Sequence, residues 1–185
     1  VDEQIDLLKE KEKLSESEEE TLQTFLSDFH DLMGRQRGVV SKRQVFDRTI
    51  RKAKEVGQRH FYNRVFADYR GRLYLQDTGL SYQGGDLQRG IVQFPQGKVI
   101  QPDDWKFIWL HLANTWGIKG AWEERVEAAK QMKSKVLRFA ADPLNTYDEW
   151  SGAGDKWQFI RTCFEIRDLL DNPDNPSHLI CELDQ

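Results

Sequence analysis

The string Asp68-Tyr69-Arg70-Gly71-Arg72 contains the side chains of this sequence best suited to hold phosphate groups. Both arginines are permanently charged, and their planar guanidinium groups donate paired hydrogen bonds that match phosphate oxygens. Gly71 permits a tight turn and a close approach of the backbone to a ligand. Asp68 could orient either arginine through a salt bridge. Taken alone, the string is also compatible with an ordinary surface turn, because Arg-Gly-Arg turns arise by chance in many proteins.

The strongest positive charge of the chain surrounds this string. Residues 35–72 contain 12 lysines and arginines against 3 acidic residues, which gives a net charge of +9. Residues 1–34 contain 3 against 11, a net charge of -8, and the whole chain has a net charge of -4. A local field of this size attracts phosphates whatever the total charge. The alternative is a solvated helix face, which is what charge runs usually form.

Composition excludes several classes of protein. With 6 Trp, 10 Phe and 5 Tyr among 185 residues, the chain has too many aromatic residues for wholesale disorder, although 31% of it is charged. This length suits one domain, or a domain with a helical arm. No apolar run approaches the roughly 18 residues that a membrane span needs, and no signal peptide opens the chain, so we expect a soluble cytoplasmic protein without membrane association. Cys163 and Cys181 form neither a disulfide framework nor a Cys-x-x-Cys metal motif.

Helical periodicity dominates the first third of the sequence. Residues 2–14 and 17–33 each carry a thin apolar stripe, and together they predict an antiparallel helical hairpin with an acidic surface. Gly34 is expected to end the second helix, and Gly38 and Ser41 to interrupt the chain. A third helix is expected from about 42 to 57, with Gly57 at its end.

The period then changes to that of strands. Residues 61–76 predict two strands joined by a turn at Gly71, residues 79–85 predict a loop, and residues 90–94 predict another strand. Helices are expected at 102–115, 121–141 and 155–170. A short apolar strand is expected at 178–183, directly before Asp184. The sequence therefore indicates an α+β fold with a helical arm in front.

The string at 68–74, Asp-Tyr-Arg-Gly-Arg-Leu-Tyr, resembles the D-x-x-G-R motif of the single-subunit, phage- and mitochondrial-type RNA polymerases. Further segments resemble motifs of that family in the same order: Gln83-Gly84-Gly85-Asp86 with Gly90, Gly97-Lys98-Val99-Ile100, His111 with Ala113-Asn114, Asp142-Pro143-Leu144, Cys163-Phe164-Glu165, and Leu183-Asp184 at the opening of polymerase motif A. The sequence departs from the family at Tyr82, where the family has proline, and at Gly85, where it has asparagine.

This resemblance covers residues 42–185 and implies that they form the palm part of a right-hand polymerase fold with a small antiparallel sheet. Residues 1–41 match only as a charged helical hairpin in the place of the thumb. The palm part is expected to be incomplete without a partner chain.

The resemblance also implies roles for particular residues. Asp184 would be the catalytic aspartate of motif A and a ligand of Mg²⁺ in a two-metal nucleotidyl-transfer site. Template DNA and the RNA–DNA hybrid would be held by the residues of the Arg-Gly-Arg motif and by the start of the basic helix: Asp68, Arg70, Gly71, Arg72, Tyr74, Lys42 and Arg43.

The family's fingers string, R-x-x-x-K-x-x-x-x-x-x-Y-G, does not occur among the 185 residues. The second metal-binding aspartate belongs to motif C, which we expect on another polypeptide. Because one aspartate cannot assemble a two-metal site, the chain is expected to be inactive alone, as a truncated polymerase or as the smaller subunit of a heterodimeric phage RNA polymerase. Its expected partners are the polypeptide with fingers and motif C, the DNA template, the nascent RNA and ribonucleoside triphosphates, in the host bacterial cytoplasm if it is phage-encoded.

Two other functions remain open at this point. The chain could be a non-catalytic nucleic-acid-binding accessory protein derived from the polymerase fold, in which the arginines matter and Asp184 does not. It could also be a helical interaction module without affinity for nucleic acid.

Overall fold

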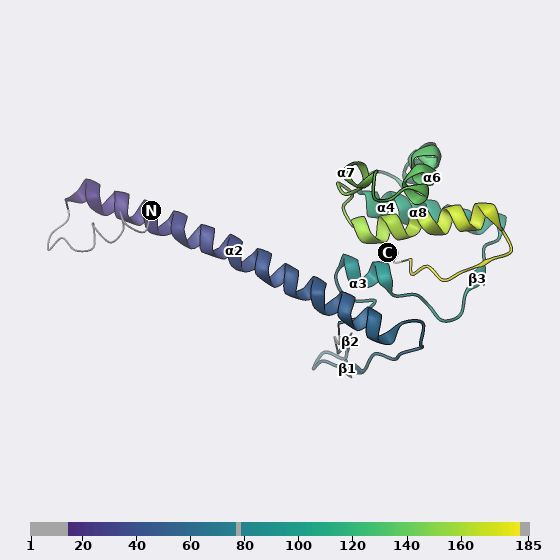
Figure 1. Ribbon diagram of the computed structural model, residues 1–185, viewed down its shortest axis with the longest axis horizontal. Helices are drawn as coiled ribbons and strands as arrows, with labels where there is room; N and C mark the ends of the chain where they lie inside the picture. The colour runs from purple at the N-terminus through teal and green to yellow at the C-terminus, as the bar shows by residue number, and fades with distance from the viewer. Residues whose placement is uncertain (1–14, 77–78, 182–185) are drawn as a thin grey trace. The chain divides into compact units, whose positions relative to one another are not determined.

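The computed structural model describes residues 15–76 and 79–181 (Figure 1). The chain divides into two compact units, residues 1–48 and residues 49–185. Helix α2 (Glu16–Val56) supplies the described part of the first unit, and its last turns belong to the second. In the described part of the chain, no helix is both long enough and apolar enough to cross a membrane.

Helix α2 is continuous, so the predicted interruption between Gly34 and Ser41 is wrong. Each glycine inside a helix costs only about 1 kcal/mol relative to alanine, and the residues between Gly34 and Gly38 are arginine and glutamine, which favour helix. The helix does end as predicted, at Gly57, which has φ 59° and donates its N–H to the carbonyl of Ala53 at 2.8 Å. The helix predicted at 2–14 lies outside the described residues.

The predicted pair of strands around Gly71 is confirmed. Strand β1 (Val65–Ala67) pairs antiparallel with strand β2 (Leu73–Leu75), with Phe66 opposite Tyr74. The strand predicted at 90–94 is wrong: residues 90 and 91 belong to helix α3 (Asp86–Ile91), and residues 92–94 have no strand structure.

A second small sheet joins distant parts of the sequence. Strand β3 (Lys98–Val99) pairs antiparallel with strand β4 (Pro176–Ser177). The strand predicted at 178–183 is wrong for residues 178–181, which have no strand structure, and residues 182 and 183 lie outside the described range. His178 bonds to Phe94 through its backbone carbonyl and its Nδ1 atom, and these bonds do not extend the ladder.

Helices form the rest of the second unit, in the order η1 (Pro102–Asp104), α4 (Trp105–Trp116), α5 (Trp122–Gln131), α6 (Lys133–Ala141), α7 (Tyr147–Trp150) and α8 (Lys156–Asp171). The predicted helices at 102–115 and 155–170 are confirmed. The range 121–141 is helical but divided at Met132, whose N–H bonds to the carbonyl of Ala129, three residues back. With mostly helices and two small antiparallel sheets, the α+β prediction is confirmed.

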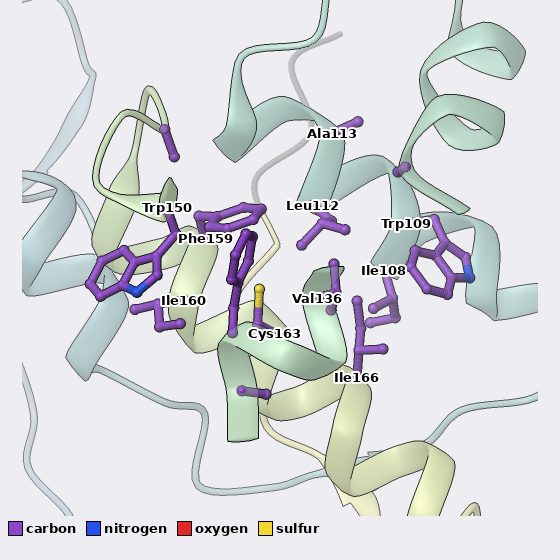
Figure 2. Packing of buried hydrophobic residues seen from close by; sticks show 14 of the residues in the cluster. Ile108, Trp109, Leu112, Ala113, Val136, Trp150, Phe159, Ile160, Cys163 and Ile166 are labelled. Carbon is purple, nitrogen blue, oxygen red and sulfur yellow. The ribbon is translucent and has the colours of Figure 1, made fainter. Parts of the chain in front are cut away.

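The core of this unit lies where α8 packs against α4 and α6. Figure 2 shows Phe159 and Cys163 of α8 gathered with Leu112 of α4 and Val136 of α6. Phe159 is fully buried, and its ring centroid lies 4.8 Å from that of Trp116 and 6.2 Å from that of Phe139. Helix α8 therefore lies at the centre of the unit: it contacts α3, α4, α6 and α7, whereas α5 packs against α4.

Candidate nucleic-acid interface

The Arg-Gly-Arg string forms the turn of the β1–β2 hairpin. The N–H of Asp68 donates to the carbonyl of Arg72 at 2.9 Å, and the N–H of Gly71 donates to the carbonyl of Asp68 at 3.0 Å. Gly71 has φ 76°, a left-handed conformation that a glycine adopts without steric cost. A short hairpin loop with a left-handed glycine at its end matches the twist of the flanking strands, so this sequence forms the turn from local chemistry.

Asp68 holds the backbone of the turn and not its arginines. Its Oδ1 atom accepts hydrogen bonds from the N–H groups of Arg70 at 2.8 Å and Arg72 at 2.9 Å. Among the ion pairs of the described residues, none joins Asp68 to either arginine, so the salt bridge considered from the sequence is not formed. The carboxylate stabilises the loop, and both guanidinium groups are left exposed to solvent.

Aromatic rings accompany the exposed arginines on this hairpin. Tyr69 is 88% exposed, and the Cζ atom of Arg70 lies 5.2 Å from the centroid of its ring. Phe66 and Tyr74 lie side by side across the strands, with ring centroids 5.8 Å apart. The hairpin therefore presents fixed positive charge and flat apolar surface together.

The other two predicted binding residues, Lys42 and Arg43, belong to the first unit. Both are exposed on α2, and the Nε atom of Arg43 lies 3.9 Å from a carboxylate oxygen of Asp47 one turn along the helix. An exposed pair of this length contributes little to stability, so it leaves Arg43 able to exchange partners.

The segment at 83–90 connects the hairpin to the core. The Oε1 atom of Gln83 accepts the N–H of Leu75, the last residue of β2, at 3.0 Å. The carboxylate of Asp86 accepts the N–H groups of Trp157 at 2.9 Å and Gln158 at 3.0 Å, in the first turn of α8. These are N–H groups without a partner inside the helix, so Asp86 caps α8 from 71 residues away in the sequence.

Gly90 lets α3 pack closely against α8 because it has no side chain. A Cβ atom at this position would lie 2.9 Å from the backbone carbonyl group of Trp157, which only a shift of α3 or α8 would relieve. The family resemblance pointed to Gln83, Asp86 and Gly90 without assigning roles to them. Their contacts indicate that they position the hairpin against the core.

The segment that leads toward Asp184 is held by α8 and by the loop around Phe94. Glu165 is 6% exposed, forms an ion pair with Arg161 at 2.9 Å, and accepts the N–H of His178 at 3.3 Å. The Nδ1 atom of His178 lies 2.8 Å from the carbonyl oxygen of Phe94. In the other direction, the backbone N–H of Phe94 donates to the carbonyl of His178 at 3.2 Å. Sequence reasoning placed Glu165 in a motif but missed that it anchors this segment.

Asp184 itself lies outside the described residues. Among residues 15–76 and 79–181, no group of three or more His, Cys, Asp or Glu side chains could hold a metal ion. The family's motif C carries its aspartate in a His-Asp pair. The one such pair of this sequence, His30-Asp31, is exposed on α2 in the first unit. A carboxylate such as that of Asp184 is the donor type that Mg²⁺ prefers, so the residue type fits the expected metal.

His111, within another of the family-like segments, is a buried neutral residue of α4. It is 3% exposed, and its Nε2 atom has no hydrogen-bond partner within the described structure. Burial, with a smaller contribution from the charge of Arg89, lowers the pKa of its imidazole from 6.5 to about 4. This places His111 in the structural core and not in the binding surface.

The buried histidine predicts a pH dependence of stability. Because its pKa is lower in the folded chain than in the unfolded chain, its contribution is complete above pH 6.5 and is lost as the pH falls toward about 4. The loss approaches about 3 kcal/mol of unfolding free energy at the acidic end. Urea unfolding between pH 7.5 and 4.5 should show this slope in the wild-type chain and a smaller one in His111→Gln. Parallel pH profiles for the two chains would contradict it.

Comparisons with known proteins show what the chain is similar to. Residues 98–184 match the family model described as DNA-dependent RNA polymerase. The chain is 30% identical over 138 residues, 74% of its length, to the mitochondrial DNA-directed RNA polymerase of Neurospora crassa, of which it covers 10%. It is 30% identical over 143 residues, 77% of its length, to that of Schizosaccharomyces pombe, of which it covers 12%. To the human mitochondrial enzyme it is 29% identical over 118 residues, 60% of the chain and 10% of that protein. The chain thus spans about a tenth of the length of these curated relatives.

Proposed function

Since the chain corresponds to a portion of a single-subunit DNA-dependent RNA polymerase, we propose that it binds template DNA and the RNA–DNA hybrid through the β1–β2 hairpin and contributes Asp184 to a nucleotidyl-transfer site. The second aspartate and the fingers come from a partner polypeptide. The chain acts as the smaller subunit of a heterodimeric phage-type enzyme in the bacterial cytoplasm, with ribonucleoside triphosphates as substrates and nascent RNA as product.

The observation that carries this proposal is the geometry of the hairpin turn. Because the carboxylate of Asp68 is occupied by the backbone N–H groups of Arg70 and Arg72, it does not neutralise their side chains. Two exposed cations on a turn of fixed shape suit the sugar-phosphate backbone, which is recognised by charge and position and not by base identity. In the first unit, Lys42 and Arg43 are further exposed cations that would bind phosphates.

The contacts around His178 support a role for Asp184. Glu165 and Phe94 restrain the chain at His178, six positions before Asp184 in the sequence, and β4 restrains it just upstream. A carboxylate that binds Mg²⁺ during nucleotidyl transfer needs a restrained backbone near it, because precise positioning supplies much of the catalysis. Bound Mg²⁺ would activate the attacking hydroxyl and neutralise charge on the leaving pyrophosphate.

An accessory protein without catalytic residues is the second candidate. It rests on the same hairpin, whose exposed arginines suffice for binding, and it gives Asp184 no role. The two proposals share the predictions for Arg70 and Arg72 and differ on Asp184.

Binding to nucleic acid should depend on Arg70 and Arg72 in a salt-sensitive way. For Arg70→Gln and Arg72→Gln we expect a roughly tenfold loss of affinity each for an RNA–DNA hybrid with a single-stranded template overhang, from loss of a charge-assisted contact. Each change should also reduce the slope of log affinity against log salt by about one. Fluorescence anisotropy with the 185-residue chain, over a series of salt concentrations, measures both quantities.

A matched control is Lys119→Gln, which removes an exposed positive charge outside the hairpin. It should leave the affinity and the salt slope unchanged. If Arg70→Gln and Arg72→Gln left both quantities at the wild-type values, the hairpin would not be the binding surface and the proposed function would be wrong.

A further inference from the structure

The register of the β1–β2 hairpin sorts its side chains onto two chemically different faces. Opposed residues lie on the same face, and successive residues alternate between faces. Val65 opposite Leu75 and Ala67 opposite Leu73 make one face entirely aliphatic. Phe66 opposite Tyr74 makes the other face aromatic.

The aromatic face is open to solvent. Phe66 is 53% exposed and Tyr74 is 39% exposed, and their rings are inclined by 31° to each other at 5.8 Å. By the same alternation, Arg64 before β1 and Arg72 before β2 belong to this face, and both are exposed. The two rings form an apolar surface, and each end of this face has an arginine, with Asp68 opposite Arg72 and Gln76 opposite Arg64.

We propose that the Phe66–Tyr74 face is a stacking site for an unpaired base of single-stranded nucleic acid, an inference that rests on the proposed binding by the hairpin. An aromatic ring binds a base through the π face, which is accessible in a single strand and covered by neighbouring bases inside a duplex. The flanking arginines then hold the phosphates on either side of that base. The aliphatic face has neither rings nor charge, so it does not share this chemistry.

Base stacking and phosphate binding can be separated by removing the base. Affinities of the 185-residue chain are measured for a DNA oligonucleotide, for an RNA of the same sequence, and for the same DNA with abasic sites. Phe66→Leu keeps an apolar side chain but removes the ring. We therefore expect a roughly tenfold loss of affinity, relative to the wild type, for the base-bearing strands, and no loss relative to the wild type for the abasic strand. The slope of affinity against salt should stay at the wild-type value, because no phosphate contact is removed.

The DNA and RNA arms identify the source of the base. A larger loss on DNA assigns the site to the template, and a larger loss on RNA assigns it to the transcript. Leu73→Ala is the matched control: Leu73 is 66% exposed on the aliphatic face of the same hairpin, so this variant should bind every strand as the wild type does. Equal losses from Phe66→Leu and Leu73→Ala, or the same loss with and without bases, would overturn the stacking site.

A second measurement uses the unaltered chain. An oligonucleotide that carries 5-iodouracil should form photo-crosslinks that map by mass spectrometry to Phe66 or Tyr74. Crosslinks that map only to other residues would overturn the proposal. So would a Phe66→Leu defect confined to assembly with a partner polypeptide, because that would make the face a protein interface.

The variants also distinguish the stacking site from the proposed function. If Arg70→Gln and Arg72→Gln weaken binding while Phe66→Leu does not, the stacking site is wrong and the proposed function stands. If none of the three variants weakens binding, the proposed function itself is wrong.

Discussion

Replacing Asp184 with asparagine is expected to lower nucleotide addition by the assembled polymerase about a thousandfold or more, with template binding retained. A metal ligand in a nucleotidyl-transfer site contributes several kcal/mol of transition-state stabilisation, and each 1.4 kcal/mol, roughly, is a factor of ten in rate. Asparagine has nearly the size of aspartate but no charge, so the change weakens the binding of Mg²⁺ with little change in side-chain volume.

Primer extension on an RNA–DNA scaffold, with Mg²⁺ and ribonucleotides, measures this effect. The chain alone should extend nothing, and extension should begin when the polypeptide that carries the fingers and motif C is added. Asp174→Asn is a suitable control, since Asp174 is an exposed acidic residue of the loop after α8. Synthesis retained by Asp184→Asn would favour the accessory protein, and synthesis by the wild-type chain alone would refute the need for a partner.

The largest expected effect on stability is that of Phe159→Ala, a loss of about 3–5 kcal/mol of unfolding free energy. Phe159 has no exposed surface and contacts the rings of Trp116 and Phe139, so its removal leaves a cavity at the centre of the core (Figure 2). Because α8 also carries the N–H groups that Asp86 caps and the carboxylate of Glu165, loosening this helix should disturb both proposed parts of the site.

Urea unfolding followed by tryptophan fluorescence gives the required free energies. Leu144→Ala provides the comparison, because Leu144 is 85% exposed and its truncation should change the stability by less than about 0.5 kcal/mol. A loss below about 1 kcal/mol for Phe159→Ala would mean that the core around α8 tolerates a void of this size, against the general behaviour of buried aromatic residues.

Local chemistry accounts for the features that could be predicted from the sequence. The β1–β2 hairpin follows from alternating apolar residues around Gly71, since a left-handed glycine is needed within the turn itself. Helices α4 and α8 follow from apolar periodicity and from breaking residues at their ends. The end of α2 at Gly57 likewise follows from a residue that breaks the helix. The charge pattern and the Arg-Gly-Arg string likewise identified the binding candidates, although their role remains a proposal.

The predictions that failed depended on contacts beyond the local sequence. Residues 90–94 contain Ile91 and Val92, which favour a strand, but α3 forms because Gly90 lies against the backbone of Trp157 and Asp86 binds the first turn of α8. Gly34 and Gly38 resemble helix ends, yet α2 continues because its neighbouring residues favour helix and no proline lies between Glu16 and Val56.

The sequence by itself therefore determined which residues are available for chemistry: a turn that presents Arg70 and Arg72, and an aspartate at position 184. Only the tertiary structure decided what positions them. Asp68 binds the turn backbone instead of an arginine, Asp86 caps a helix 71 residues away, and Glu165 holds the chain at His178. The physical reason is the separation along the sequence over which each interaction acts. Turn and helix signals act over a few residues, whereas a carboxylate accepts hydrogen bonds from any N–H groups that folding brings within about 3 Å of it.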